Sequence, residues 1–423
     1  MTVSHPEPAG SPRTLHIPRY LILFIGALIA VGPLSLDAYL PAMPAMAAAF
    51  GVGIVRLNTT ISVYLVGYGL GVFFGGSFSD QVGRKRVGLI GLTVFTLASL
   101  SIGFAHTVEQ VQWLRFVQAI GGGFSTVICM AMVRDVYAVE ELGRRMAMVT
   151  LVMLASPVVA PTLGAALLRF GWPSIFFFKA AYAGSLATYY ATSVPETRPG
   201  EWRNLSVLAT LRQCVQVIAR KDENGRHPIT IAISLALGAG VFMTFLTNAA
   251  FAYIQYFGVS PTHFPLYFGC GVVGMIAANI YSMGHLNPRN APAFFRLGLA
   301  VQLVAAVSLV AIVLAGPSIW PVVACVAVIV AAFGLAGPAG SSTYIRHYDR
   351  LAGSASSLYT TMFFSLGAIL GWVTGMFFDG TLRPMVLTML VSCVASNACA
   401  FLTGATMSRR GQHGEATRAA GQT

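Results

Sequence analysis

Long hydrophobic stretches separated by short polar turns dominate this chain of 423 residues. About twelve of them reach the roughly 20 mainly apolar residues that a helix needs to cross a bilayer. They are centred near residues 30, 68, 96, 122, 156, 183, 242, 273, 303, 329, 364 and 393. A large soluble protein with many buried helices would need polar faces at 3.6-residue spacing, which these stretches mostly lack. The pattern therefore predicts an all-α membrane protein with twelve transmembrane helices.

The longest polar interruption divides the predicted helices into two groups of six. It covers residues 195–227 and is rich in charged side chains. A cytoplasmic linker between equal halves is typical of transporters built from repeats, with the substrate site near the bilayer midplane between the halves. We expect a tail over 1–18, a first half over 19–194, the linker, a second half over 228–404 and a tail over 405–423. Within the linker, residues 205–218 show an amphipathic pattern that predicts a short surface helix.

Composition agrees with this prediction, because 56% of the residues are hydrophobic and only 9% are charged, with a mean hydropathy of +0.72. A net charge of +12 is also compatible with an anionic partner such as nucleic acid. The positions of the 26 Lys and Arg residues decide against it. With both termini in the cytoplasm, three of them lie outside, namely Arg56, Arg169 and Arg383, and two lie within spans, namely Arg115 and Lys179. All the others lie on the cytoplasmic side. This positive-inside asymmetry orients the protein and predicts no nucleic-acid partner.

Cysteine and histidine positions give no sign of a metal centre or a disulfide. The six cysteines lack paired or metal-ligand spacing, and the eight histidines fall in predicted loops, tails or helix ends. A membrane enzyme would need a nucleophile–base pair or a ligand set at matched depth. We therefore expect no cofactor, no metal and no enzymatic activity, and any proton chemistry must use other groups.

A charged turn separates the second and third predicted helices. Its pattern, Gly-x-x-x-Asp-x-x-Gly-Arg-Lys, is formed by Gly76, Asp80, Gly83, Arg84 and Lys85. It resembles the loop signature of the major facilitator superfamily of transporters. That resemblance implies twelve helices in two six-helix halves.

The same resemblance implies a gate at the cytoplasmic face. Asp80 and Arg84 would meet Arg134 and Asp135 at the end of the fourth helix, and the cluster would brace the start of the eleventh helix. An acid at a helix N-terminus interacts favourably with the helix dipole. Gln81 stands where a basic residue is usual, which removes one basic contact. The alternative interpretation is ordinary topogenic surface charge.

Asp37 is the one carboxylate among the 14 Asp and Glu residues that falls well inside a predicted span. An ionised side chain at this depth costs at least ~2.5 kcal/mol on insertion scales, so it normally faces a cavity or a partner. Alternatively, it lies near the outer helix end and reaches water. Residues 33–44, which include Asp37 and Tyr39, resemble the first-helix signature of the bicyclomycin and chloramphenicol resistance subgroup, the Bcr/CflA drug:proton antiporters.

Two further motifs lie in the fourth and fifth predicted helices. Arg115 and Gln118 resemble the family's Arg-x-x-Gln motif, whose arginine is implicated in proton coupling. Arg115 and Asp37 lie at similar depth, so pairing is possible; the alternative is that Arg115 snorkels to the outer headgroups. Pro157, Pro161 and Gly164 indicate a kinked, closely packed helix, and they resemble the antiporter motif of exporters in this superfamily.

Lys179 is unexpected in the sixth predicted helix. It either snorkels or faces the cavity, where it would favour an anionic or zwitterionic substrate. The second half carries no charge in mid-span, and its polar and aromatic residues, including Asn248, Tyr253 and the pair Phe363 and Phe364, suit amphipathic organic molecules.

The resemblance covers residues 20–404 and implies a proton-coupled exporter of drugs or drug-like small molecules in the bacterial inner membrane, acting as a monomer. Its expected partners are a small organic substrate, protons and the lipid bilayer. The alternative within the same fold is a carrier for a dedicated metabolite or siderophore, including one that imports its substrate.

Overall fold

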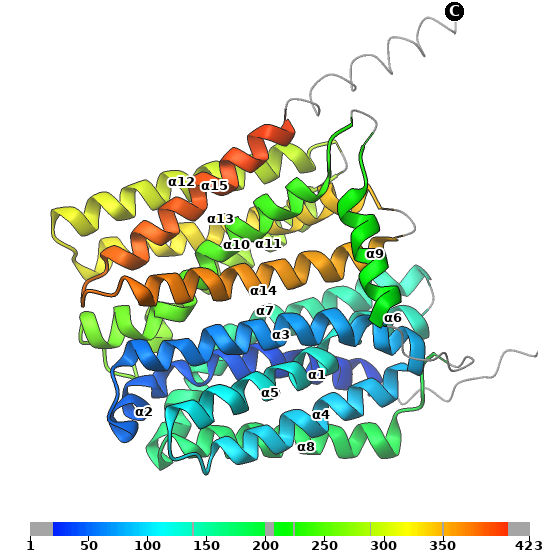
Figure 1. The fold of residues 1–423 in the computed structure, drawn as a ribbon, viewed down its shortest axis with the longest axis horizontal. Helices are drawn as coiled ribbons and strands as arrows, with labels where there is room; N and C mark the ends of the chain where they lie inside the picture. The colour runs from blue at the N-terminus through cyan, green and yellow to red at the C-terminus, as the bar shows by residue number, and fades with distance from the viewer. Residues whose placement is uncertain are drawn as a thin grey trace, which may run out of the picture.

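Long helices joined by short connections make up this protein. The computed structural model describes residues 20–404 except 138, 199–206, 223–224, 288 and 349–350, and no strand occurs among them. Within this part, 11 helical spans are long and apolar enough to cross a membrane. The remaining long helix, Pro173–Ser193, has 21 residues and runs beside Arg84–Ile102 (Figure 1). Lys179 and several hydroxyl side chains lower its hydropathy, and its length and position agree with the predicted set of twelve.

The first six spans form one half of the molecule, which Figure 1 shows as the blue to green helices. Short 3-10 turns or breaks divide some spans into two helices. Their bounds are α1 (Leu21–Asp37), η1 (Leu40–Ala42), α2 (Met43–Phe50), α3 (Ile54–Val82), α4 (Arg84–Ile102), α5 (Val108–Val127), α6 (Cys129–Val136), α7 (Val139–Leu167), η2 (Leu168–Phe170) and α8 (Pro173–Ser193).

The other six spans form the second half, and the linker helix α9 stands between the halves in the sequence. The bounds are α9 (Val207–Ala219), α10 (Ile229–Ala250), the π-helical η3 (Phe251–Tyr256), α11 (Phe264–His285), α12 (Ala291–Ala315), α13 (Ile319–Ile345), α14 (Ala352–Met376) and α15 (Arg383–Gly404). The halves meet where α3 packs against α14 and α7 packs against α11. Every predicted hydrophobic centre falls within one of these spans.

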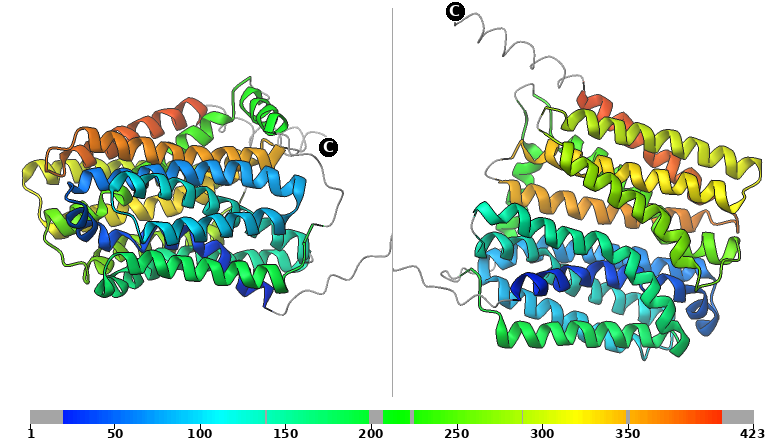
Figure 2. Two further views of the ribbon diagram at one scale, coloured as in Figure 1. Left: turned by 60° about the horizontal axis from the view of Figure 1, so that its bottom comes forward. Right: turned by 180° about the vertical axis from the view of Figure 1, so that it is seen from behind.

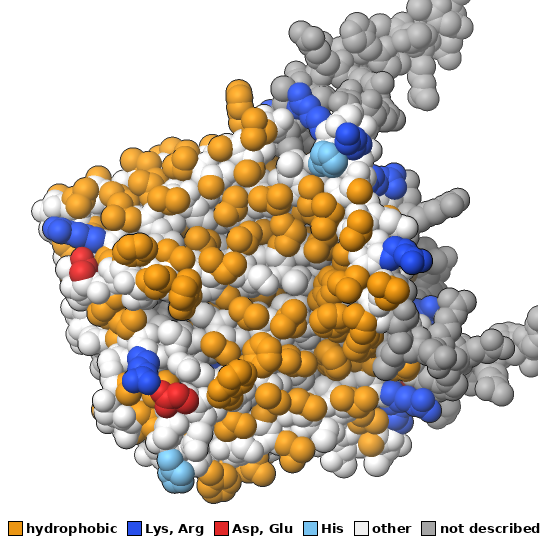
Figure 3. Space-filling model, viewed as in Figure 1, with side chains coloured by type: hydrophobic (Ala, Val, Ile, Leu, Met, Phe, Trp, Pro, Cys, Tyr) orange, Lys and Arg blue, Asp and Glu red, His pale blue; other side chains and the backbone are white. Residues whose placement is uncertain are grey.

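The two ends of the molecule differ in charge. α9, the beginning of α1 and the end of α15 share one end, which is called the inner end below (Figure 1). Figure 3 shows most of the Lys and Arg side chains of that face near this end, and a broad hydrophobic surface over the helices between the ends. The predicted multi-pass arrangement is confirmed, and the shared end of α1 and α15 agrees with the prediction that both termini are cytoplasmic.

Close helix packing depends on glycine in the second span, as its repeat every four residues indicates. A β-carbon on Gly67 would lie 2.6 Å from the Phe116 carbonyl oxygen, and one on Gly71 would lie 2.6 Å from that of Ile120. Small residues let helix backbones approach in this way in membranes. This face of α3 is therefore filled by α5.

Candidate transport site

The first span breaks near its outer end. α1 contains Pro33 and ends at Asp37. Its last backbone hydrogen bond joins the Ala38 amide to the Leu34 carbonyl at 3.3 Å. Beyond this point the chain turns into η1, and the Ser35 carbonyl accepts hydrogen bonds from side chains of other helices. The break therefore provides an acceptor inside the bundle.

Arg115 lies fully buried at this break. Its Nη1 donates to the Ser35 carbonyl at 3.0 Å and to Gln118 Oε1 at 2.9 Å. The guanidinium lies 4.2 Å from the ring centre of Tyr64 and 4.7 Å from that of Tyr39, a cation–π arrangement. Arg115 thus points into the first half, and the snorkelling alternative is wrong.

Two other predicted residues support this arrangement. Gln118 is buried and donates from Nε2 to Ser99 Oγ at 2.7 Å, which orients its oxygen toward Arg115. The Tyr39 hydroxyl hydrogen-bonds Thr60 on α3. Both residues therefore fix the surroundings of the guanidinium from α5, α4 and α3.

Asp37 is only 3% exposed, so it does not reach bulk water past the helix end. Within the described part of the chain it forms no hydrogen bond and no ion pair, with Arg115 or any other residue. Its charge interacts with that of Lys179. Asp37 and Arg115 therefore lie in one cluster without the direct pair that the sequence suggested as possible.

The sequence left open whether Lys179 snorkels or faces the cavity. In the structure this residue is only 1% exposed. It faces the interior of the first half, and its Nζ donates to the Ser35 carbonyl at 2.9 Å. Lys179 does not snorkel, and it does not line the cavity described below. We call Asp37, Arg115 and Lys179 the buried charge cluster.

The predicted motif of two prolines and a glycine on α7 packs against the same break at the end of α1. α7 is one helix with Pro157 and Pro161 inside it, and from behind it lies over α1 (Figure 2). A β-carbon on Gly164 would lie 1.8 Å from the Ala38 carbonyl oxygen. Gly164 therefore lets the backbone of α7 touch the chain directly after Asp37.

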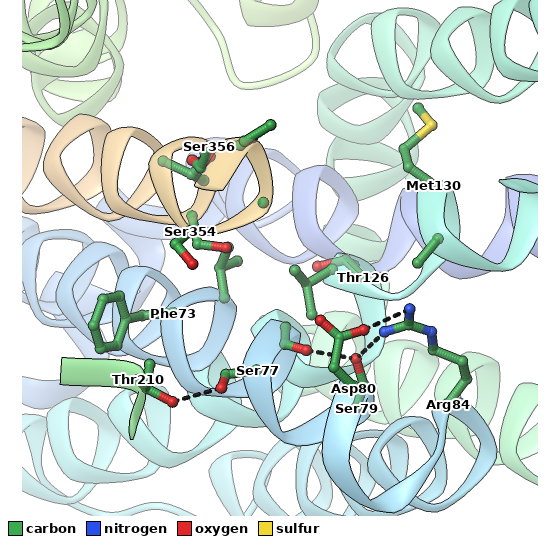
Figure 4. Close-up of a pocket in the computed structure, with 18 of the residues that line it drawn as sticks. Phe73, Ser77, Ser79, Asp80, Arg84, Thr126, Met130, Thr210, Ser354 and Ser356 are labelled. Atoms are coloured by element: carbon green, nitrogen blue, oxygen red, sulfur yellow. Dashed lines mark hydrogen bonds and ion pairs between the residues drawn. The ribbon is translucent and has the colours of Figure 1, made fainter. Parts of the chain in front are cut away.

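A cavity of about 850 Å³ lies between the halves toward the inner end. Aromatic and hydroxyl side chains from both halves line it (Figure 4), including Tyr68, Phe73, Thr126, Ser357 and Phe364. None of the buried charge cluster does. Of the second-half residues that the sequence predicted for the substrate cavity, Phe364 lines this one.

On the outer side of the molecule, by contrast, the two halves are in contact. Asn58 Nδ2 on α3 donates to Asn248 Oδ1 on α10 at 3.4 Å, and both residues are buried. Asn248 therefore belongs to an outer contact rather than to the inner cavity. Together, these features indicate an inward-facing arrangement.

The charged turn forms a compact cluster at the inner end, with Arg84 only 6% exposed. Arg84 pairs with Asp80 at 2.7 Å and with Asp135 at 3.2 Å, and its Nη1 donates to Ser79 Oγ at 2.6 Å (Figure 4). Gly83 has a φ of 97°, a conformation that favours glycine. Arg134 lines the cavity beside this cluster.

Among the described residues, no hydrogen bond or ion pair joins the start of the eleventh span to this charge cluster. Ser354 on α14 donates to Gln213 on α9 at 2.8 Å, while Thr210 on α9 hydrogen-bonds Ser77 on α3 at 2.5 Å. The amphipathic linker helix therefore connects the two halves across the inner end of the cavity. Gly76 lies on the α14 side of α3, and a β-carbon there would lie 3.4 Å from Ser357 Oγ.

Sequence reasoning missed two residues that follow α8. Arg198 Nη1 lies 2.5 Å from Asp80 Oδ1, which supplies a basic contact although Gln81 is uncharged. Glu196 accepts hydrogen bonds from the backbone amides of Arg84 and Lys85 at 2.9 and 3.0 Å. A carboxylate at the first turn of α4 is stabilising there. Both residues are more than 110 positions from the turn, so no local pattern signals the contact.

These contacts predict unequal effects at the turn. We expect Arg84→Gln to lower the free energy of unfolding by about 1.5–3 kcal/mol, because it removes the charged hydrogen bonds of a buried guanidinium to Ser79 and Asp135. Arg198→Gln should cost at most about 1 kcal/mol, because both its side chain and that of Asp80 are about half exposed. Chemical unfolding of the two variants in detergent measures this difference, and equal losses would contradict it.

Comparison with known proteins adds independent support to the geometry. Residues 23–372 match the Major Facilitator Superfamily. A bicyclomycin resistance protein homolog from Haemophilus influenzae is 29% identical over 92% of this chain and 98% of its own length. A chloramphenicol resistance protein from Pseudomonas aeruginosa is 28% identical over 82% of this chain and 81% of its own length. These relatives confirm the subgroup resemblance noted in the first span.

Solved structures show the same fold. A bacterial homolog of the human lysosomal transporter Spinster, inward-facing and unoccupied, has a TM-score of 0.72 at 13% identity, with 92% of this chain and 97% of that chain covered. A POT family transporter in complex with 5-aminolevulinic acid also has a TM-score of 0.72, at 11% identity, with coverage of 92% and 96%. The spans and the bacterial relatives together describe a multi-pass protein of the inner membrane. Because the family match extends over most of the chain, this protein belongs to the Major Facilitator Superfamily of transporters.

Proposed function

We propose that this protein exports drugs or drug-like organic molecules across the inner membrane in exchange for protons. The observation that carries the proposal is Asp37, a buried carboxylate at a helix break inside a transporter fold. The names of the relatives, which refer to bicyclomycin, chloramphenicol and multidrug resistance, support drugs as the substrate class. The close α7–α1 packing at Gly164 fits the antiporter motif and supports export.

The substrate would occupy the cavity between the halves. Its aromatic and aliphatic surfaces, which include Tyr68, Phe73 and Phe364, provide apolar contact, and Thr126 and Ser357 provide hydrogen bonds. Such a lining suits amphipathic molecules. Lys179 lies outside this cavity, so its charge does not select an anionic substrate there. We infer transport by a monomer, with halves at 19–194 and 228–404, and no enzymatic reaction.

Asp37 would bind a proton from the outer side and release it toward the cytoplasm as the halves rock about the substrate site. The turn cluster around Arg84 would hold the inner ends of α3, α4 and α6 in register during this movement. Each positive charge that enters a cell at 100 mV, negative inside, releases about 2.3 kcal/mol. This is enough to concentrate a substrate several-tenfold, so one proton per cycle suffices for useful export.

The test is accumulation of a drug panel in inverted membrane vesicles with an imposed pH gradient, acidic inside. We expect the unmodified protein to accumulate at least one drug, and Asp37→Asn to lower gradient-driven accumulation at least about tenfold, because the amide cannot carry a proton. Asp379→Asn is the matched control, since this carboxylate lies exposed near the outer end of α14. It should accumulate drug normally.

Two outcomes would contradict the proposal. Unchanged accumulation by Asp37→Asn would remove Asp37 from coupling. Gradient-driven movement of no drug in the panel would favour the dedicated-metabolite carrier.

A further inference from the structure

Lys179 neither snorkels nor lines the cavity between the halves, the two positions considered from the sequence. It projects from α8 toward α1, and its Nζ lies 4.7 Å from the ring centre of Phe176 and 5.7 Å from that of Tyr39. An ammonium group at this depth is costly and usually has a function or a partner of opposite charge.

Two cations from different helices converge on a single backbone oxygen. The Ser35 carbonyl accepts from Lys179 Nζ at 2.9 Å and from Arg115 Nη1 at 3.0 Å. The two positive charges repel each other, and one neutral carbonyl cannot balance both. Arg115 has additional support from Gln118 and from two tyrosine rings. Within the described residues Lys179 forms one hydrogen bond, so it is the less firmly held of the pair.

Asp37 supplies a carboxylate beside these two cations, and its negative charge attracts the ammonium group of Lys179. It lies two residues after Ser35 at the same break. The charged and titratable groups around Lys179 are therefore Asp37 and Tyr39 from the first span and Arg115 from α5. Among these groups, protonation of Asp37 removes the one carboxylate charge beside Lys179 and Arg115.

We infer that Lys179 is a positioning residue for proton coupling, which transmits the charge of Asp37 to the break in α1. This inference rests on the proposed proton-coupled function. When Asp37 is ionised, it attracts the Lys179 ammonium and weakens the hold of that ammonium on the Ser35 carbonyl. When Asp37 has bound a proton, the attraction is lost and Lys179 returns to the carbonyl beside Arg115. The occupancy of this carbonyl thus changes with each proton that enters and leaves.

The test separates the charge of Lys179 from its hydrogen bond. Lys179→Gln can still donate to the Ser35 carbonyl but carries no charge. We expect it to lose gradient-driven drug accumulation in inverted vesicles at least about tenfold, while drug exchange without a gradient and drug binding in detergent remain. A merely structural role would affect all three equally. Lys221→Met, at an exposed linker position, is the control for loss of a lysine.

A double variant provides a second measurement. If Lys179 acts through Asp37, then Asp37→Asn with Lys179→Gln should lose no more accumulation than the worse single variant. Independent roles would multiply the two losses, which would overturn the inference. Gradient-driven accumulation by Lys179→Gln at the unmodified level would overturn it as well. If the unmodified protein shows no gradient-driven accumulation, the proposed function itself fails and the role of Lys179 fails with it.

Discussion

Gly164→Ala should abolish transport and strongly lower the thermal stability of the purified protein. The added methyl group would lie 1.8 Å from the Ala38 carbonyl oxygen and 2.7 Å from the carbonyl carbon. These are backbone atoms, so no flexible side chain can move aside, and α7 must separate from α1. Ordinary overpacking costs about 1–3 kcal/mol, and a backbone clash of this size should exceed that range. The clash lies at Ala38, next to Asp37, so we expect proton coupling to be lost together with the packing of α7 on α1.

Gly184→Ala is the matched control for this prediction. Gly184 also lies inside a transmembrane helix, but its added β-carbon would lie 3.5 Å from Thr96 Cγ2, an ordinary contact. Alanine favours helix more than glycine by about 1 kcal/mol, so this variant should be as stable as the unmodified protein or slightly more so. Thermal unfolding in detergent and vesicle transport measure both variants. A Gly164→Ala protein with unmodified stability would show that α7 and α1 do not approach as described.

Arg115→Lys should cost transport at least about tenfold although it keeps the positive charge. The guanidinium bridges the Ser35 carbonyl and Gln118 Oε1 while its face covers Tyr39 and Tyr64. Both hydrogen bonds come from Nη1 at the end of the long arginine side chain, whereas lysine is shorter and its ammonium group has no flat face to cover the two rings. Loss of one charged hydrogen bond costs about 1.5–3 kcal/mol, which corresponds to a factor of roughly ten to a hundred.

Arg56→Lys controls for the same chemical change outside the membrane. Arg56 pairs with Glu109 at the outer end, where both side chains are more than half exposed, and exposed pairs contribute little. Drug accumulation by this variant should stay within about twofold of the unmodified protein. Retained accumulation by Arg115→Lys would show that position 115 requires charge alone, and the geometry described for the guanidinium would then have no functional role.

The sequence also predicted much of the inner end, but not how its charges pair. The motif from Gly76 to Lys85 predicted the α3–α4 turn, and the pair between Arg84 and Asp135 lies where the family resemblance implied. Arg198 and Glu196 were missed because the linker reaches the turn only after α8 has crossed the bilayer. The basic contact that Gln81 cannot provide therefore comes from another part of the chain.

The sequence by itself determined the order of the spans, their expected orientation and which ionisable residues fall within them. These properties depend on the length of apolar stretches and on the side of each Lys and Arg, and both are local. Which buried charges meet was decided only by the tertiary structure. Successive residues on a helix differ by about 100° in direction, and a span that is apolar all round gives little sign of which face points inward. The rotation of α8 therefore placed Lys179 beside Ser35, two residues before Asp37 at the break in α1.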